Sequence, residues 1–445
     1  MITNITVQNS HLTSLTSLIA SSVQEVIAAH ASVGVTVPSL DSVEPGPFDG
    51  PVEEVPERLV RAIRLVEAAC AQLVSTVSIP KLHLVNKANA HAEPSCLLVV
   101  TDAKIPDLLV GRPEGVHVDQ LAAESSFKDA DKLGRVMRLL AARHVFREVK
   151  PNVYANNRLS AKLISKDPLC DFIGLQTDEG MLATAYLNET YTTPPRVHDE
   201  TPIQRATGYK LFDWYNLPEN KEKGERFNRA MVGLGDIYGR GYLTKAYPWT
   251  ELSGERTICD IGGGNGHVTM DLSKKNPNFK VVLQDQPEVL VQAKEYWSTQ
   301  YPQAVQEGKV RFVPINFLRD NAVEGCDVYY VKSILHDWPD AECLTILQNI
   351  RKAMKPGARL IIHEIAISSA GRLEQLAEEP APEPLLPNWG VSAARTFEAD
   401  IRMMKMFNAK ERTLEEYTSL CEKRGLQFRK LYPAGEMDLL EFIAV

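Results

Sequence analysis

The chain has 445 residues, too many for one ordinary hydrophobic core, so we expect two or three domains. Its 44% hydrophobic and 24% charged residues are typical of globular proteins, and a net charge of −8 argues against a general nucleic-acid-binding or membrane-binding surface. Its cysteines form no Cys-x-x-Cys pair, which fits reduced thiols. We see neither an apolar run of about 18 residues nor a signal peptide, so the expected location is the cytoplasm.

Residues 1–97 are expected to form a helical extension with a proline-rich linker. Hydrophobic periodicity predicts helices over residues 12–31 and 57–77, and five prolines fall between positions 38 and 56. No residue pattern here points to chemistry. Packing against a partner subunit is the favoured role for this extension.

Residues 98–225 are expected to form a winged-helix-like domain with connecting helices. A strong helix is predicted over residues 132–144, and two short strands flank the turn at Pro151 and Asn152. DNA binding is one interpretation of this pattern, but the acidic chain favours a dimerisation platform. The DNA-binding interpretation would depend on Lys132, Arg135, Arg138 and Arg143.

Residues 226–445 are expected to form the catalytic domain. From residue 256 onward strands and helices alternate, which predicts a mostly parallel, doubly wound α/β sheet of the Rossmann-like class. Two runs near the end, residues 428–431 and 439–444, predict a terminal antiparallel pair. The proline-rich, acidic segment 377–390 predicts a mobile surface insertion.

The stretch TICDIGGGNGHVTM, residues 257–270, predicts a strand, a glycine turn and a helix. Gly262 and Gly264 start the spacing Gly-x-Gly-x-Gly, whereas a dinucleotide fingerprint would need a third glycine at His267. No Gly-Lys-Ser/Thr follows, which excludes a P-loop. The turn therefore fits a nucleoside ligand without a phosphate group, such as S-adenosylmethionine, because glycines allow close approach to the main chain.

Asp285 ends the second predicted strand, 25 residues after Asp260. An acid about 20 residues beyond such a turn is placed to accept hydrogen bonds from ribose hydroxyls. The alternative is that Asp285 only caps the helix that begins near Pro287. We favour the ribose role.

The segment VKSILHDW, residues 331–338, carries the densest chemical signal. A buried strand brings Lys332 and then His336 to the carboxyl edge of the sheet, where ligands bind in open α/β folds. Imidazole titrates near neutral pH and is a suitable base for a phenol, whose pKa is about 10 as judged from tyrosine. Glu364 and Glu411 are available to orient the imidazole. The competing interpretations are a structural histidine and, for Glu411, a solvated acid.

Together, DIGGGNG, Asp285, VKSILHDW, HEI and MMKMFNAKERT resemble the plant-type and fungal small-molecule O-methyltransferases, which include the caffeate and flavonoid enzymes. The resemblance covers roughly residues 98–445. It implies a winged-helix dimerisation domain, an S-adenosylmethionine domain, an intertwined homodimer and a small aromatic substrate. It implies His336 as catalytic base flanked by Glu364 and Glu411; Gly262, Gly264, Asp285, Gln286, Asn316, Phe317 and Lys332 as cofactor contacts; and Met231, Trp338, Met403 and Phe407 as pocket wall.

Relatives often have aspartate where this chain has Asn316, and the amide oxygen is expected to bond the adenine amino group instead. The expected reaction is methylation of a phenolic hydroxyl, with S-adenosylhomocysteine as coproduct. The expected mechanism needs no metal, and the sequence spacing shows no ligand cluster for one. Three alternatives stay open: an N-methyltransferase, a non-catalytic cofactor-binding dimer that regulates a partner, and a DNA-binding regulator.

Overall fold

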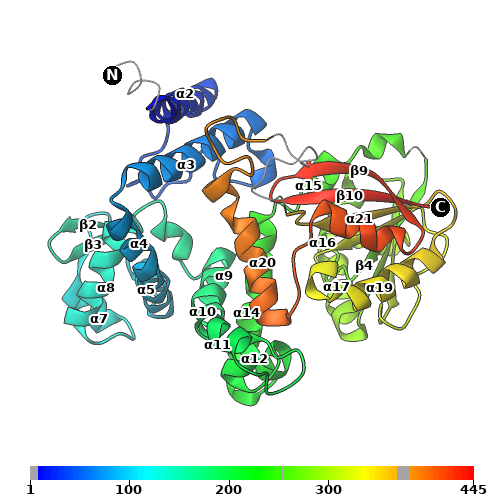
Figure 1. Cartoon of the computed structure of the whole chain (residues 1–445). Helices are drawn as coiled ribbons and strands as arrows, with labels where there is room; N and C mark the ends of the chain where they lie inside the picture. Colours follow the sequence, from blue (N-terminus) through cyan, green and yellow to red (C-terminus); the bar gives the residue numbers. More distant parts are fainter. Residues whose placement is uncertain (1–8, 253, 368–379) are drawn as a thin grey trace. The chain divides into compact units, whose positions relative to one another are not determined.

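The computed structural model describes residues 9–252, 254–367 and 380–445 (Figure 1). The chain divides into two compact units, of which the first comprises residues up to Ile237 together with Ala381–Ser392. The second comprises Tyr238–Pro380 and Ala393–Val445. This division differs from the expected one, because position 225 lies inside helix α14 (Lys221–Ile237) and position 97 lies inside α5 (Ala92–Asp102).

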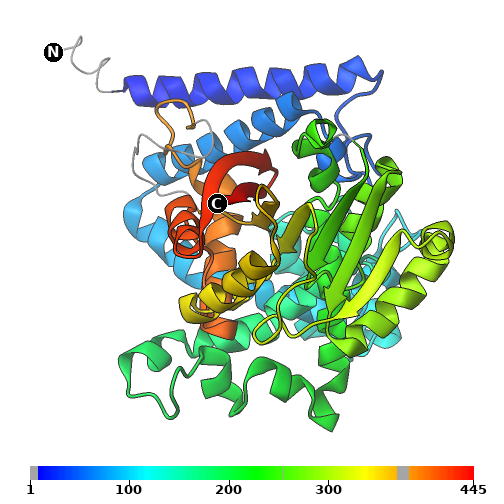
Figure 2. The same ribbon diagram turned by 90° about the vertical axis from the view of Figure 1, so that its right-hand side faces the viewer.

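Two long helices confirm the predicted N-terminal elements, α2 (Ser10–Ser32) and α3 (Glu57–Val77). They run side by side in the first unit (Figure 2) and are joined by an ion pair between Arg58 and Glu25. By length and composition, α2 would also pass as a membrane-spanning helix, which the sequence analysis did not anticipate. It nevertheless carries Glu25 and packs along α3.

The strap, as we call residues 381–392, leaves the second unit and packs in the first. Leu385 and Trp389 are buried, and the guanidinium carbon of Arg64 lies 4.3 Å from the centre of the Trp389 ring. Gln72 donates a hydrogen bond of 2.8 Å to the carbonyl of Pro384. The prediction of a mobile surface insertion is therefore wrong for residues 380–390, because Ala381, Leu385 and Trp389 are buried. Residues 377–379 lie outside the described part of the chain.

The first unit contains the predicted winged-helix pattern. Its core is formed by Leu133, Met137 and Leu140 of α8, which pack with Phe146 and Tyr154 of the hairpin. The three strands pair in the order β1-β3-β2. The elements are η1 (Val52–Glu54), α4 (Pro80–Ala88), η2 (Asn89–His91), α6 (Ile105–Leu108), β1 (Val116–His117), α7 (Val118–Glu124), α8 (Ala130–Ala142), β2 (Phe146–Lys150), β3 (Val153–Asn156) and η3 (Ser160–Leu163).

The rest of the first unit is helical, as predicted. Buried Glu179 is compensated by Arg226 of α14, at 2.6 Å, and the same guanidinium reaches Asp178 at 2.7 Å. These ion pairs fix α14 to the start of α10. The elements are α9 (Pro168–Thr177), α10 (Glu179–Ala185), α11 (Leu187–Thr192), α12 (Pro202–Thr207), α13 (Leu211–Tyr215) and η4 (Pro218–Asn220).

The second unit is built on a sheet in the order β6-β5-β4-β7-β8-β10-β9. The strands β4 to β8 are parallel, and the last two are antiparallel, which confirms the predicted doubly wound sheet and terminal pair. The strands are β4 (Arg256–Ile261), β5 (Phe279–Asp285), β6 (Val310–Pro314), β7 (Val328–Lys332), β8 (Arg359–Glu364), β9 (Leu426–Ala434) and β10 (Met437–Ala444).

Helices cover both faces of this sheet (Figure 2). Alternate residues of β4 explain this, since Ile258 packs with Val268 and Leu272 of α16, whereas Cys259 packs with Ile346 of α19. The helices are α15 (Tyr242–Ala246), η5 (Trp249–Glu251), α16 (His267–Lys275), α17 (Pro287–Gln300), α18 (Pro302–Gln306), η6 (Leu335–Asp337), α19 (Asp340–Ala353), α20 (Ala394–Phe407) and α21 (Leu414–Glu422), with η7 (Gly390–Ala393) at the end of the strap.

Candidate active site

The glycine turn connects β4 to α16 at the carboxyl edge of the sheet, as predicted. Gly262 has φ +68° and Gly264 has φ +59°, a backbone conformation that strongly favours glycine. A Cβ atom at position 262 would lie 2.5 Å from Cδ1 of Ile334, whereas one at position 264 would meet open space. The turn therefore comes close to the end of β7 on one side and leaves its main chain accessible on the other.

Asp285, at the end of β5, is bound to this turn. Its Oδ2 accepts the N–H of Gly264 at 2.8 Å, and its Oδ1 accepts the N–H of Gln286 at 2.7 Å. Gln286 itself is the N-cap residue of α17, and it makes no side-chain cap. Asp285 thus supports the glycine turn instead of capping the helix, and the exposed Gln286 lies beside it.

Asn316 and Phe317 follow β6 at the same edge of the sheet. The side-chain oxygen of Asn316 already accepts the N–H of Leu318 at 3.2 Å, so an adenine amino group would be its second donor. The Phe317 ring lies 5.9 Å from the Trp338 ring, edge to face. A Cβ at position 262 would also lie 3.7 Å from Phe317, so this ring borders the glycine turn.

Lys332 is the last residue of β7 and is half-buried. Burial lowers the pKa of its ammonium group, and the nearby Glu364 and Asp260 act in the opposite direction. The glycine turn, its open side at Gly264 and the carboxylate of Asp285 fit a nucleoside with free ribose hydroxyls. Lys332 and Phe317 complete this edge of the candidate cofactor site.

The structure brings His336, Glu364 and Glu411 together from three distant segments. His336 lies in η6, Glu364 ends β8, and Glu411 precedes α21. Nδ1 of His336 is 2.9 Å from Oε1 of Glu411 and 3.7 Å from Oε2 of Glu364. Asp337 is a third acid, with Oδ1 3.6 Å from Nε2 of the same ring.

These charges decide the protonation of His336. Burial alone would lower the pKa of the imidazole, but Asp337, Glu364 and Glu411 together raise it to about 10. The imidazolium form therefore predominates at neutral pH. Burial raises the pKa of Glu364 from its ordinary value, partly offset by the charge of His336.

The two glutamates are held in different ways, Glu364 through its carboxylate and Glu411 through its backbone. Oε1 of Glu364 accepts the N–H groups of Ile334 and Leu335, each at 2.8 Å. The backbone N–H of Glu411 donates to Asp400 at 3.0 Å. Among the described residues, Oε2 of each glutamate has no hydrogen-bond donor, although both atoms are buried. These two oxygens are available to the imidazolium or to a bound molecule.

The same three side chains have ligand atoms within 4.8 Å of one another, so they could also collect a cation. The sequence spacing gave no sign of this, because the three residues come from remote segments. The 2.9 Å contact between Nδ1 of His336 and Glu411 is short enough to be a hydrogen bond, which uses the nitrogen that a metal would need. A chelator can separate the two uses of the cluster.

The four residues predicted to form a pocket wall lie in both units. Trp338 lies directly after η6 against Phe317, and Met403 is buried on α20, which contacts η6. Phe407 ends α20 and is half-buried. Met231 lies on α14 in the first unit, where it is half-buried.

Several residues near the site were missed by sequence reasoning. Asp337 is next to His336, and Asp400 and Arg412 hold the segment that carries Glu411. Buried Asp260 accepts the hydroxyl of Thr269 beneath the glycine turn at 2.6 Å. The segments HDW and KERT contain the charged residues Asp337 and Arg412 beside the predicted His336 and Glu411. The sequence alone does not show which of these side chains point into the protein.

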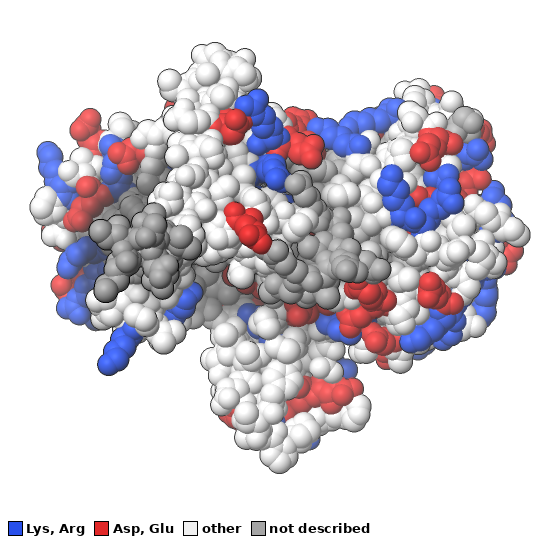
Figure 3. All heavy atoms as spheres, turned by 45° about the horizontal axis from the view of Figure 1, so that its top comes forward, with Lys and Arg blue, Asp and Glu red and all other residues white. Residues whose placement is uncertain are grey.

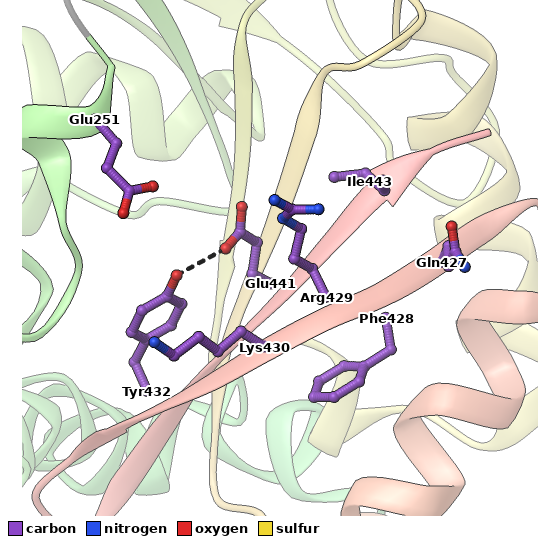
Figure 4. A pocket seen from close by; sticks show the side chains of 8 residues that line it. All are labelled: Glu251, Gln427, Phe428, Arg429, Lys430, Tyr432, Glu441 and Ile443. Carbon is purple, nitrogen blue, oxygen red and sulfur yellow. Dashed lines mark hydrogen bonds between the residues drawn. The ribbon is translucent and has the colours of Figure 1, made fainter.

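A separate pocket of about 370 Å³ lies on the β9–β10 hairpin (Figure 4). Tyr432 donates to Oε2 of Glu441 there at 3.0 Å, and Arg359 lies 3.1 Å from Oε1 of the same carboxylate. The pocket contains none of the predicted site residues. Its lining consists of Glu251, Gln427, Phe428, Arg429, Lys430, Tyr432, Glu441 and Ile443.

Surface charge does not favour the DNA-binding interpretation. Basic and acidic side chains are intermingled on the face shown in Figure 3. On and beside α8, three of the basic side chains named above lie close to acids. The pairs are Lys132–Asp129 at 2.7 Å, Arg135–Asp131 at 2.6 Å and Arg143–Glu93 at 3.6 Å.

Comparison with known sequences gives two family matches along the chain. Residues 194–427 match the O-methyltransferase domain, and residues 85–166 match the O-methyltransferase dimerisation domain. A protein named 3-O-methyltransferase 2 from Phanerochaete chrysosporium is 44% identical over 98% of both chains. An O-methyltransferase from Armillaria gallica is 30% identical over 95% of both chains.

Solved structures confirm the fold. Mitomycin 7-O-methyltransferase MmcR superposes with a TM-score of 0.67 at 23% identity, covering 84% of this chain and 99% of its own. N,N-8-amino-8-demethyl-D-riboflavin dimethyltransferase (RosA) from Streptomyces davawensis gives 0.63 at 22% identity, covering 83% of this chain and 100% of its own. The two names differ in the acceptor atom, so this fold alone does not decide between oxygen and nitrogen.

Proposed function

Because the chain belongs to the family of S-adenosylmethionine-dependent small-molecule O-methyltransferases, we propose that it methylates a phenolic hydroxyl of a small aromatic compound, with His336 as the general base. One observation carries this proposal: the 2.9 Å contact between Nδ1 of His336 and Glu411. It fixes the ring and leaves Nε2 for the substrate, because a base needs one nitrogen held and the other available.

The cofactor supplies an electrophilic methyl group on a positively charged sulfur. Gly262 and Gly264 would let its nucleoside approach the main chain, and Asp285 would accept the ribose hydroxyls. Gln286, Asn316, Phe317 and Lys332 surround the same edge. Near the base, Trp338, Met403 and Phe407 would form the aromatic and thioether wall for a flat substrate.

The raised pKa of His336 suits a phenol. An imidazole of ordinary pKa would take a proton from a phenol of pKa about 10 at a cost of roughly 5 kcal/mol. With its pKa at about 10, His336 accepts the phenol proton with almost no such cost. Glu411 and Glu364 stabilise the imidazolium that results, and the phenolate oxygen becomes a strong nucleophile. The requirement is that His336 first be neutral, so the reaction is favoured at alkaline pH.

A homodimer is part of this proposal. The match to an O-methyltransferase dimerisation domain over residues 85–166 supports it, and the named O-methyltransferase relatives support oxygen as the acceptor atom.

The decisive experiment measures transfer of a labelled methyl group from S-adenosylmethionine to a panel of phenols, each paired with its aniline. Wild type is compared with His336→Asn, with and without a chelator, and cofactor affinity is measured by calorimetry. We expect the variant to lose about a hundredfold or more in kcat and to keep its cofactor affinity. Chelator should leave wild type unchanged.

Other outcomes would favour other functions. Methylation of anilines but not phenols would indicate an N-methyltransferase. Cofactor binding without transfer to any acceptor would support the regulator. Loss of transfer on chelation would assign the cluster of His336, Glu364 and Glu411 to a metal.

A further inference from the structure

We infer that Arg412 is a positioning residue for the base: its buried guanidinium clamps the turn that carries His336. This inference rests on the proposed function of His336. Arg412 follows Glu411 directly in the chain, so one short segment supplies both the carboxylate that binds the imidazole and the cation that holds the imidazole's own turn.

The contacts of Arg412 bracket His336. Its Nη1 donates to the carbonyl of Leu335 at 2.8 Å, and its Nη2 donates to the carbonyl of Trp338, also at 2.8 Å. These two carbonyls lie just before and just after the His336–Asp337 pair. A planar guanidinium is suited to holding two acceptors at a fixed separation, which a lysine ammonium cannot do.

The clamp is anchored on its outer side by Asp340, at the start of α19. Oδ1 of Asp340 accepts Nη2 of Arg412 at 2.7 Å and Nε at 3.1 Å. The guanidinium is fully buried, whereas the Asp340 side chain is 57% exposed. Cys343 also contacts both clamped carbonyls, at 3.2 and 3.3 Å, but a thiol is a weak donor.

The backbone of Arg412 is tied to the strand that delivers Glu364. Arg412 bridges Ala366 in parallel, and its carbonyl accepts the N–H of Ile367 at 3.0 Å. The segment with Glu411 and Arg412 therefore lies beside the residues that directly follow β8. The two partners of His336, Glu364 and Glu411, thus belong to neighbouring segments, and Arg412 links these segments to η6.

This arrangement predicts that Arg412 acts on the rate of proton transfer and not on binding. Misplacement of a catalytic group by about 1 Å can cost a hundredfold in rate. Arg412→Lys keeps the charge but loses the two-carbonyl fork. We expect it to lower kcat on an ordinary phenol by about tenfold or more while the KM for the phenol and the Kd for S-adenosylmethionine stay within about twofold.

A second substrate separates positioning of the base from general damage. A nitro-substituted analogue that is already ionised at the assay pH does not need a base. If Arg412 acts through His336, Arg412→Lys and His336→Asn should both lose far less rate on this analogue than on the parent phenol. Equal losses on both substrates would overturn the inference.

Arg351→Met is the matched control. Arg351 is another guanidinium of the second unit that donates to two main-chain oxygens, those of Gly425 at 3.0 Å and of Val445. Its removal should lower the Tm without changing the ratio of rates on the two substrates. If Arg351→Met and Arg412→Lys had similar Tm values and lost kcat equally, Arg412 would contribute only to stability.

Asp340→Asn keeps the inference testable if Arg412→Lys does not fold. The Asp340 side chain is exposed, so the substitution should leave the core intact. The substitution removes the negative charge that anchors the Arg412 guanidinium. We expect a smaller loss of kcat, about threefold, with the same pattern on the two substrates. Wild-type kcat in every folded variant would overturn the inference, whereas an inactive wild type would instead count against the proposed function.

Discussion

The glycine turn and the His336 turn lie at the same sheet edge but are held by different forces. The glycine turn is bonded mainly by its own neighbours and by Asp285, 21 positions beyond Gly264. The His336 turn is held by charged groups far along the chain, since Glu411 lies 75 positions and Arg412 lies 76 positions beyond His336. The cofactor edge is thus encoded locally, whereas the base is assembled only by the complete fold.

This difference separates two kinds of vulnerability. Backbone conformation determines the structure of the glycine turn, so substitutions there should affect cofactor binding and stability. Charged side chains hold the His336 turn in place, so substitutions there should affect the reaction rate and its pH dependence. The following variants test whether the two turns can be perturbed independently.

The largest expected effect concerns Asp260, beneath the glycine turn. Burial raises the pKa of this carboxyl to about 7. A folded-state pKa above the unfolded value of about 4 gives stability that is fully present below pH 4, falls as pH rises and levels off above the folded pKa of about 7. We expect wild type to lose about 3 kcal/mol of unfolding free energy between pH 5 and 8 relative to Asp260→Asn. Urea unfolding at each pH measures this, and parallel curves would contradict it.

Next in size is Gly262→Val. A β-branched residue is strained at φ +68°, and its Cβ would press on Ile334. We expect the Kd for S-adenosylmethionine to rise by about a hundredfold, measured by calorimetry. Gly308→Val is the control, because Gly308 has φ +64° but no neighbour within 4 Å. Equal weakening of cofactor binding by Gly308→Val would show that the effect does not depend on the position of Gly262 in the glycine turn.

A smaller effect is expected for Glu411→Gln. With the pKa of His336 at about 10, kcat/KM of wild type should rise with pH across the range from 7 to 9. The variant lacks one of the charges that raise this pKa, so its rising limb should move to lower pH while its maximal rate falls by about tenfold. Rate profiles on one phenol measure both changes. An unshifted limb would mean that Glu411 does not act on the base.

The smallest effect is expected for Thr269→Val. Its hydroxyl donates to buried Asp260 at 2.6 Å, and the isosteric change removes only that hydrogen bond. We expect a loss of about 1 kcal/mol in unfolding free energy, with kcat unchanged. Thr345→Val, on the exposed surface of α19, serves as the control and should be nearly neutral.

The sequence predicted the parts of the fold that depend on short-range patterns. Apolar periodicity placed α3 at Glu57–Val77, and alternation of strands and helices predicted the parallel sheet with its antiparallel end. The glycine spacing predicted the turn at Gly262. Each of these follows from backbone conformation or hydrophobic burial within about 20 residues.

The unpredicted features depend on long-range contacts. Nothing near Arg412 in the sequence shows that its guanidinium reaches Leu335 and Trp338. Nothing near Trp389 shows that its ring packs under Arg64 of α3, so a proline-rich acidic segment was mistaken for a mobile insertion. Burial of one aromatic side chain outweighed the local composition.

The strap also limits how this protein can be cut into pieces. Because residues 381–392 pack in the first unit, the chain crosses between its two units three times. A recombinant fragment that starts at Tyr238 would carry buried Trp389 without α3, whose Arg64 packs on its ring. Such a fragment would expose apolar side chains to other molecules, so truncation at Tyr238 should yield more aggregate than the 445-residue chain does.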